Sequence, residues 1–251
     1  MPGCVSRLKA VLLDLGDTLV YMNRSWDELF SDNLRALYDY LIKLDIKLDR
    51  QKFTRTFIRT YNDASYSADL YRTEIPMEAI ITKALKKFGV RPTDDMVSKG
   101  TAEFFGPEVE SWQLFPDTMD ILSGLERDGY MMGLISNTKS DWAVHAILQR
   151  RGLEQFFKTI VTSAAVKVRK PRPEIFLRAL EDLSIPASEA IFVGDSIQSD
   201  VSGAKHMGIR SIHVARKPVE PEGFTQPDAT VKSLTEAFEI ITQWKNLPMK
   251  R

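Results

Sequence analysis

Four short polar segments follow apolar stretches of this sequence, and their side chains are of the types that phosphoryl transfer uses. In chain order they are Asp14, Ser136-Asn137-Thr138, Lys170-Pro171, and the segment 194–200, which carries Asp195. Carboxylates suit a hard cation, a hydroxyl with backbone amides suits an oxyanion, and a lysine offsets negative charge. These groups are sufficient in type for phosphoryl transfer, because its catalysis consists mostly of positioning and charge neutralisation.

The first segment indicates how these groups could meet. Residues 10–13 form an apolar run that is far too short to span a membrane and is typical of a buried parallel strand. Asp14 stands where that strand would end. Reactive groups of open α/β sheets lie in the crevice at the carboxyl ends of the strands. Asp is also common in strand-to-loop turns, so Asp14 alone is weak evidence and the other three segments decide.

The elements that would position these groups alternate regularly in the second half of the chain. Strands are predicted at 130–135, 159–162, 190–193 and 211–214, with a short one near 229–231; helices are predicted at 116–129, 140–151, 173–183, 200–207 and 234–244. Such alternation implies parallel strands joined by right-handed crossovers. The expected fold class is therefore α/β, with a doubly wound, Rossmann-like parallel sheet as its core.

Between the first strand and the rest of this sheet lies a long region with helical periodicity and little strand character. Helices are predicted at 25–44, 49–64, 77–88 and 93–105, the first opening on a capping box at Ser25-Trp26-Asp27-Glu28. The pattern changes at Gly106-Pro107. We expect a core domain of residues 1–20 and 108–251 and an inserted four-helix cap domain of residues 21–107.

Composition excludes several functional classes. The chain has 251 residues, 43% of them hydrophobic and 27% charged, and its 34 basic and 34 acidic residues leave no net charge. We therefore expect a globular protein with no nucleic-acid partner and no membrane partner. The first nine residues lack the apolar core of a secretory signal, and no apolar run approaches the ~20 residues of a membrane span, so a cytoplasmic location is expected.

Cysteine and histidine usage suggests neither a disulfide nor a transition-metal site. Cys4 is the single cysteine, which rules out an intramolecular disulfide and a cysteine-based metal cluster and fits a reducing compartment. His145, His206 and His213 show no metal-ligand spacing and are expected on the surface or in packing. The proline-containing segment 217–227 is expected to be an irregular surface loop.

Taken together and in this order, each at a predicted strand end, the four segments resemble the motifs of the haloacid dehalogenase-like hydrolase superfamily. The resemblance covers nearly the whole chain, and the helical insertion after the first motif matches the members that carry a cap there. It implies that Asp14 is a nucleophile that forms an aspartyl-phosphate and also binds Mg²⁺. The substrate would then be a small phosphorylated molecule; the oligomeric state stays open.

The resemblance also implies roles for the other motif residues. Ser136 and the backbone at Asn137 would bind the phosphoryl oxygens, and Lys170 would offset the charge shared by phosphate and Asp14. Asp195 would be the second carboxylate ligand of Mg²⁺. Asp200 would support the metal site or orient Lys170, with a simple helix N-cap as the alternative.

One position departs from the family pattern. Phosphatases of this family usually carry a second Asp two residues after the nucleophile, which acts as general acid and base and contributes ~10²–10⁴-fold. Here that position is Gly16, whose backbone carbonyl can still bind metal, and the next carboxylate is Asp17. In extended chain a shift by one residue turns the side chain to the opposite face, so Asp17 is not a simple replacement.

Three functions are consistent with this departure. The first is a Mg²⁺-dependent phosphatase in which Asp17, a cap residue or the substrate handles the proton. The second is a metal-independent 2-haloacid dehalogenase, which also lacks the second Asp but leaves the pair Asp195 and Asp200 unexplained. The third is a binding or regulatory protein with little catalysis. The cap would select the substrate, with Tyr21 and Arg24 as candidates; Trp26 is favoured as cap core.

Overall fold

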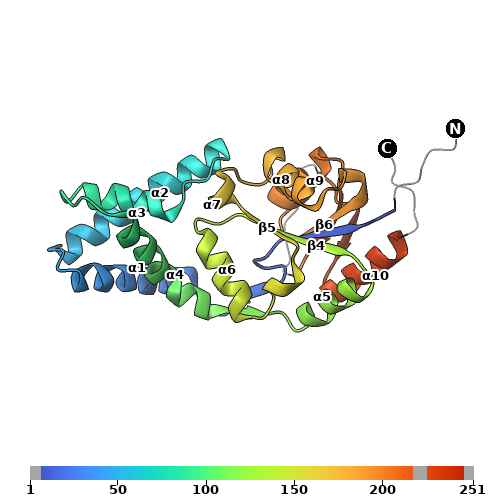
Figure 1. Ribbon diagram of the computed structural model, residues 1–251, viewed down its shortest axis with the longest axis horizontal. Helices are drawn as coiled ribbons and strands as arrows, with labels where there is room; N and C mark the ends of the chain where they lie inside the picture. The colour runs from blue at the N-terminus through green and yellow to red at the C-terminus, as the bar shows by residue number, and fades with distance from the viewer. Residues whose placement is uncertain (1–6, 217–224, 246–251) are drawn as a thin grey trace.

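A computed structural model describes residues 7–216 and 225–245 of the chain (Figure 1). Its centre is a six-stranded sheet in the order β5-β4-β1-β6-β7-β8, with every neighbouring pair parallel. The strands are β1 (Ala10–Leu13), β4 (Met131–Ser136), β5 (Thr159–Thr162), β6 (Ala190–Gly194), β7 (Arg210–Val214) and β8 (Ala229–Val231). The predicted parallel sheet is confirmed, and β1 lies in its interior between β4 and β6.

Helices cover both faces of this sheet, as the doubly wound topology requires. In Figure 1, α8 and α9 lie on one side of the strands, and α5 and α10 lie on the other. The helices that follow the strands are α5 (Thr118–Arg127), α6 (Asp141–Arg150), α7 (Ser163–Val166), α8 (Pro173–Leu183), α9 (Ser202–His206) and α10 (Leu234–Trp244). β1 and β6 are buried along their whole length, because each is covered on both faces.

Four helices follow β1 and form the left part of Figure 1. They are α1 (Trp26–Lys43), α2 (Arg50–Tyr71), α3 (Met77–Lys86) and α4 (Asp94–Ser111). Three of them begin where the sequence predicts, because a side-chain oxygen accepts a backbone N–H: Ser25 from Glu28, Asp49 from Lys52 and Thr93 from Met96. The second helix is longer than expected and ends at Tyr71 instead of residue 64.

The fourth helix was predicted to end before Gly106-Pro107, and this prediction is wrong. α4 continues through Pro107 to Ser111, although proline removes a backbone donor and disfavours a helix interior by ~3 kcal/mol. Burial of Phe105 and Val109 on the two sides of Pro107 offsets this cost. The hydroxyl of Ser111 donates to the Pro107 carbonyl oxygen at 2.8 Å. Tertiary packing therefore overrides the local helix-breaking pattern.

A short antiparallel ribbon that the sequence did not predict joins the helices to the sheet. β2 (Val20–Met22) pairs with β3 (Trp112–Leu114), with Tyr21 opposite Gln113. The two chain segments that run between sheet and helices therefore lie side by side. The division into a core domain and a cap domain at residues 20–21 and 107–108 stays a prediction, with α4 extending past the second of these boundaries.

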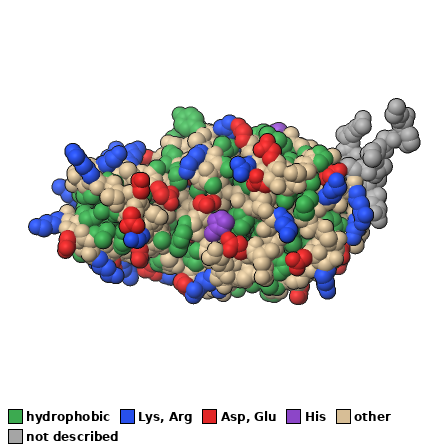
Figure 2. All heavy atoms as spheres, viewed as in Figure 1, with side chains coloured by type: hydrophobic (Ala, Val, Ile, Leu, Met, Phe, Trp, Pro, Cys, Tyr) green, Lys and Arg blue, Asp and Glu red, His purple; other side chains and the backbone are tan. Residues whose placement is uncertain are grey.

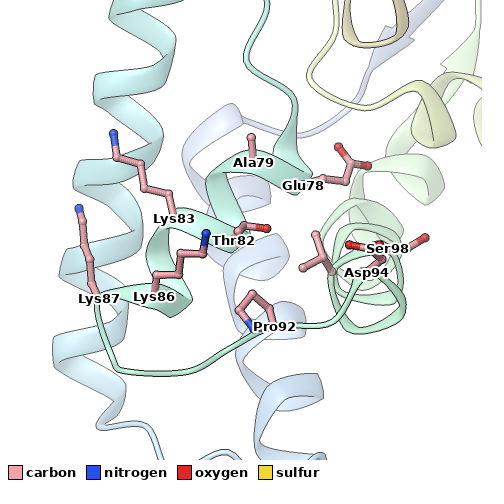
Figure 3. Close-up of a pocket in the computed structure, with 10 residues that line it drawn as sticks. Glu78, Ala79, Thr82, Lys83, Lys86, Lys87, Pro92, Asp94 and Ser98 are labelled. Carbon is pink, nitrogen blue, oxygen red and sulfur yellow. The ribbon is translucent and has the colours of Figure 1, made fainter.

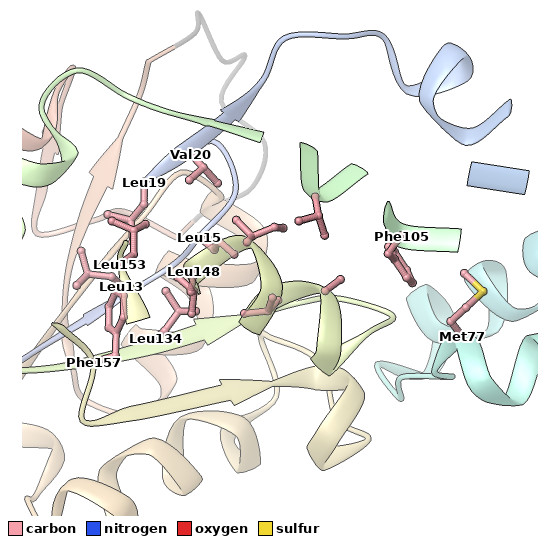
Figure 4. Packing of buried hydrophobic residues seen from close by; sticks show 14 of the residues in the cluster. Leu13, Leu15, Leu19, Val20, Met77, Phe105, Leu134, Leu148, Leu153 and Phe157 are labelled. Atoms are coloured by element: carbon pink, nitrogen blue, oxygen red, sulfur yellow. The ribbon is translucent and has the colours of Figure 1, made fainter. Parts of the chain in front are cut away.

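The apolar core is continuous from the sheet into the helical part. Figure 4 shows Leu13 and Leu134 packed among residues of the sheet side, with Phe105 and Met77 of the same cluster on the helical side. On the face shown in Figure 2, basic and acidic side chains are interspersed. Among residues 7–216 and 225–245, no helix has the length and apolar character to cross a bilayer. Cys4 and most of the segment 217–227 lie outside the described residues.

Candidate active site

The sheet brings the predicted motif residues to one cavity of about 250 Å³ at the carboxyl ends of the strands. Asp14 directly follows β1, and its backbone N–H donates to the Val193 carbonyl at 3.0 Å, which continues the pairing of β1 with β6. Ser136 is the last residue of β4 and is buried. The lining includes every residue predicted for catalysis, phosphate binding or metal binding: Asp14, Gly16, Asp17, Ser136, Asn137, Lys170, Asp195 and Asp200.

Lys170 is buried at the centre of this cavity, with 2% of its side chain exposed. Its Nζ lies 2.6 Å from Asp14 Oδ1 and 2.7 Å from Asp200 Oδ1, and it donates to the Ile135 carbonyl at 2.7 Å. Burial lowers the pKa of Lys170, but the carboxylates of Asp14 and Asp200 outweigh that effect and raise it overall. The lysine is therefore a fixed cation beside the nucleophile candidate and not a solvated surface charge.

Asn137 holds Lys170 in place through both atoms of its side-chain amide. Its Oδ1 accepts the backbone N–H of Lys170 at 2.8 Å, and its Nδ2 donates to the Lys170 carbonyl at 3.1 Å. The loop after β4 and the loop before α8 are thereby joined. The predicted phosphate binding by the backbone at Asn137 stays a prediction, while the side chain of this residue is hydrogen-bonded to the Lys170 backbone.

Three carboxylates face one another beside Lys170. Asp14, Asp195 and Asp200 each place an oxygen within 4.8 Å of the other two. Burial raises the pKa of Asp14 to about 6, with Lys170 opposing the shift. Burial, followed by the charges of Asp14 and Asp200, raises the pKa of Asp195 to about 8. A hard cation with oxygen ligands fits this donor set, since it would offset the repulsion between buried carboxylates.

The loop after β6 is shaped so that Asp200 can approach the site. A Cβ on Gly194 would lie 2.3 Å from Asp200 Oδ2, so only glycine fits there. Ser196, and not Asp200, caps the following helical turn by accepting the Ser199 N–H, which contradicts the alternative that Asp200 is a helix N-cap. Asp200 lies inside that turn, a π-helix over Ile197–Val201, and its Oδ2 accepts the Ser196 N–H at 3.1 Å.

The turn after Asp14 carries the departure that the sequence revealed. Asp17 has a φ of 54°, so the chain turns at this residue and does not continue as a strand. Strand alternation therefore does not apply, and Asp17 lines the same cavity as Asp14. At Gly16 an added Cβ would lie 3.3 Å from Cη2 of Trp112. The indole ring thus packs against the position where the usual second carboxylate would begin.

A family model of haloacid dehalogenase-like hydrolases matches residues 8–208, which include all four motifs. This chain belongs to that family. A glyceraldehyde 3-phosphate phosphatase of Methanopyrus kandleri is 23% identical, with 94% of this chain and 98% of the relative covered. A phosphoserine phosphatase of Thermus thermophilus is 31% identical over 64% of this chain and 63% of the relative.

The fold is shared with solved structures of haloacid dehalogenase-like enzymes of more than one activity. A 2-haloacid dehalogenase from Pseudomonas syringae has a TM-score of 0.67 and 23% identity, with 94% of this chain and 99% of that chain covered. At this identity the likeness shows the architecture alone. The α/β fold of this hydrolase is therefore that of its family, and the choice of reaction depends on the residues of the site.

Two residues of the haloacid dehalogenase-like site had no signal in the sequence. Glu108 lies in the last turns of α4 and Trp112 begins β3, and both line the cavity. The Trp112 Nε1–H donates to Glu108 Oε1 at 3.4 Å. Burial raises the pKa of Glu108 to about 7, with the Trp112 hydrogen bond opposing the shift. Neither residue belongs to a recognisable motif. The long helix α4 and the ribbon bring them to the site only after folding, so no local pattern marks them.

A second cavity of about 300 Å³, here called the distal cavity, adjoins the first. The two share three lining residues, Asn137, Thr138 and Glu108. Trp26 lines the distal cavity and is 45% exposed, so the expectation that it belongs to the cap core is wrong. The two other cap candidates have other partners: the Tyr21 ring lies 5.0 Å from that of Phe115, and Arg24 donates to Asp32 at 2.7 Å.

The largest of the described cavities lies elsewhere, on the outer side of the helical part. It measures about 1060 Å³ and lies between α3 and α4 (Figure 3). Lys83, Lys86 and Lys87 border it together with Glu78 and Asp94. None of the residues lining this groove belongs to the four motifs. Cavity volume therefore does not identify the active site in this chain; the placement of the motif residues does.

Proposed function

We propose that this hydrolase is a Mg²⁺-dependent phosphatase that acts on a small phosphorylated metabolite through an aspartyl-phosphate at Asp14. The observation that carries the proposal is the buried Lys170, ion-paired with Asp14 at 2.6 Å and Asp200 at 2.7 Å beside a third carboxylate, Asp195. A paired lysine and metal-binding carboxylates suit a phosphoryl group. The two relatives described above are both phosphatases, which supports the same reaction.

The proposed reaction has two displacements at phosphorus. An oxygen of Asp14 attacks, the bond to the ester oxygen breaks, and the leaving alkoxide takes a proton. Water then attacks the aspartyl-phosphate, which releases inorganic phosphate and restores the Asp14 carboxylate. The Ser136 hydroxyl and the Lys170 ammonium would hold the phosphoryl oxygens during both steps.

The metal would be held by Asp14, Asp195 and the Gly16 carbonyl, with Asp200 in support. When bound, Mg²⁺ would neutralise charge on the phosphoryl oxygens. Asp14 and Asp195 are kept close by the strands that precede them, β1 and β6, which are hydrogen-bonded neighbours. Lys170 would orient Asp14 by holding one of its oxygens.

Proton transfer is the step for which this site differs from the usual pattern of the phosphatases in its family. Gly16 has no carboxylate, and Asp17 is the residue of the turn that supplies one to the cavity. We propose that Asp17 takes part in this transfer. Because aryl phosphates need less protonation than alkyl phosphates, the enzyme should hydrolyse aryl esters faster.

Hydrolysis of p-nitrophenyl phosphate with and without Mg²⁺ tests the proposal. We expect phosphate release that needs the metal, and a loss of at least ~10³-fold in D14N, since the nucleophile is gone. The melting temperature of D14N serves as a control for folding. Release of halide from 2-chloropropionate without metal would instead identify a dehalogenase. Binding of phosphate and Mg²⁺ with no turnover on any ester would identify a regulatory protein.

A further inference from the structure

The distal cavity is where the leaving group of a bound phosphate ester would extend. A phosphoryl group at Asp14 lies in the first cavity, and Asn137, Thr138 and Glu108 border both cavities. A substrate longer than the phosphoryl group therefore passes these three residues and enters the distal cavity. What lines the distal cavity then decides which leaving groups are accepted.

Two cations line the distal cavity, and both come from loops that also carry motif residues. Lys139 follows Ser136-Asn137-Thr138, and Arg169 directly precedes Lys170. Their side chains are 11% and 20% exposed, so they are largely withdrawn from bulk water. Burial lowers the pKa of Lys139, and Glu74 opposes that shift. The same loops that would bind the phosphoryl group thus present positive charge to its leaving group.

One buried carboxylate fixes both cations. Glu74 has 0% of its side chain exposed; its Oε2 accepts from Arg169 Nη1 at 2.5 Å, and its Oε1 accepts from Lys139 Nζ at 3.4 Å. The hydroxyl of Ser163 donates to Glu74 Oε2 at 2.8 Å. Glu74 is absent from the lining of the cavity, whereas the two cations it holds are part of it. The cations are therefore held in place before any substrate binds.

The charges at this site do not balance. Glu74 is the buried carboxylate that is ion-paired with both cations. Glu108 also lines the cavity, but burial raises its pKa to about 7, which favours its neutral form. Asp69 lies 3.5 Å from Arg169, but it is 66% exposed and water screens its charge. In addition, the Nε–H of Arg169 is buried and has no hydrogen-bond acceptor. When Glu108 is protonated, about one positive charge and one donor are thus left for a ligand, which matches a monoanion.

Three aromatic rings from the helical part form another part of the cavity wall. Trp26 comes from α1, Tyr61 from α2 and Phe105 from α4, and all three line the distal cavity. The Lys139 Nζ lies 5.4 Å from the centre of the Tyr61 ring, which turns the ammonium group toward this wall. The cavity therefore combines apolar surface for a short carbon chain with a cationic side.

We propose that the distal cavity binds a carboxylate on the leaving group through Lys139 and Arg169, so the preferred substrates are short organic phosphates with a second, carboxylic acid group. This inference rests on the proposed phosphatase function. A carboxylate suits the site because its two oxygens match the fork of a guanidinium and its single charge matches the excess.

A matched pair of esters tests this inference. 3-Phosphoglycerate and glycerol 3-phosphate share a carbon chain and differ in whether the far end is a carboxylate or a hydroxymethyl group. We expect kcat/KM to be at least ~10-fold higher for 3-phosphoglycerate, as a charge-assisted hydrogen bond would give. In K139M and R169M this ratio should fall toward one. In K158M, which removes an exposed cation outside both cavities, the ratio should stay as in the wild type.

Binding of the same two esters to D14N in the presence of Mg²⁺, measured by calorimetry, separates the two proposals. A preference for 3-phosphoglycerate that is lost in D14N/K139M supports the distal site even when no ester, including p-nitrophenyl phosphate, is hydrolysed by the wild type. Equal binding of the two esters, or no binding of either, overturns it. An equal effect of K139M on both esters would mean a structural role and would also overturn it.

Discussion

At the scale of single residues, the departure at Gly16 has a physical partner in Trp112. The missing carboxylate does not leave a hole, because the indole ring lies 3.3 Å from where a Cβ would stand. An aspartate at this position must therefore displace the ring by a few tenths of an ångström. Gly16 and Trp112 belong together in the packing of the site, and restoring the usual residue involves both.

G16D should raise turnover of alkyl phosphates relative to aryl phosphates, because it supplies the acid that protonates a poor leaving group. The gain should be larger in G16D/W112F, since the shorter ring removes the contact that overpacks the site at a cost of ~1–3 kcal/mol. Steady-state kinetics on glycerol 3-phosphate and p-nitrophenyl phosphate measure the ratio. A stable double variant with the same ratio as the wild type would contradict this account of the missing acid.

Glu108 should make the stability of the protein depend on pH. Burial raises its pKa from 4.5 to about 7, so between these values the folded protein holds a proton that the unfolded chain has released. Stability therefore falls as the pH rises through this window. Because Glu108 is partly exposed, we expect Glu108 to lower the free energy of unfolding by about 1–3 kcal/mol at pH 8.

E108Q keeps the shape of the protonated side chain and cannot lose a proton. Urea unfolding at pH 5 and pH 8 should therefore show similar stability of the two proteins at pH 5 and a more stable variant at pH 8. Asp14 and Asp195 also have raised pKa values, but they are present in both proteins and cancel in the comparison. Parallel losses of stability with pH would show that Glu108 does not titrate in this range.

At the scale of elements, the site is an assembly of loops that follow neighbouring strands. β4, β1 and β6 are neighbours in the sheet, so strand pairing alone brings the residues that follow them close together. Lys170 is different, because it follows β5 only after the short helix α7. Asn137 holds Lys170 in position, because the Asn137 side-chain amide hydrogen-bonds to both the N–H and the carbonyl of the Lys170 backbone.

N137A should lower kcat about 10- to 100-fold by letting Lys170 move away from Asp14. A double-mutant cycle with K170M distinguishes positioning from direct contact with phosphate. If Asn137 acts through the lysine, N137A should add little to the loss already caused by K170M. Additive losses in the double variant would assign Asn137 a role of its own at the phosphoryl group.

At the scale of the whole molecule, two backbone connections join the helical part to the sheet domain, in addition to the packing of α4 against α6. One is the covalent ribbon of β2 and β3. The other is the connection between α2 and α3, where Glu74 N–H donates to Lys167 O at 3.0 Å and Arg169 N–H donates to Arg72 O at 3.1 Å. The ion pairs of Glu74 reinforce this second contact.

E74Q should reduce stability by about 1–3 kcal/mol, because it removes the charge that compensates Lys139 and Arg169 while keeping the shape of the side chain. D69N is the matched control, since that exposed carboxylate should contribute less than ~1 kcal/mol. Urea unfolding at neutral pH measures both. Equal, small effects of the two variants would mean that the second contact contributes little to folding.

The fold and the four motifs could be predicted from the sequence because their signals are local. Each signal depends on a short segment of the chain: an apolar run of strand length, a helix cap such as Ser25 or Asp49, or a polar residue at a strand end. The parallel sheet then brings Asp14, Ser136 and Asp195 together for any sequence with this order of strands. The continuation of α4 through Pro107 was missed, because it depends on the tertiary burial of Phe105 and Val109 and not on local helix signals.

The sequence by itself thus determined the sheet, the family and the candidate site residues around Asp14. The tertiary structure alone decided what surrounds them: Trp112 packed against Gly16, Glu108 between two cavities, and Trp26 in a cavity wall instead of the core. The physical reason is the range of the interactions. Strand ends and caps depend on neighbours a few residues away, whereas these contacts join segments about a hundred residues apart through packing that no local pattern encodes.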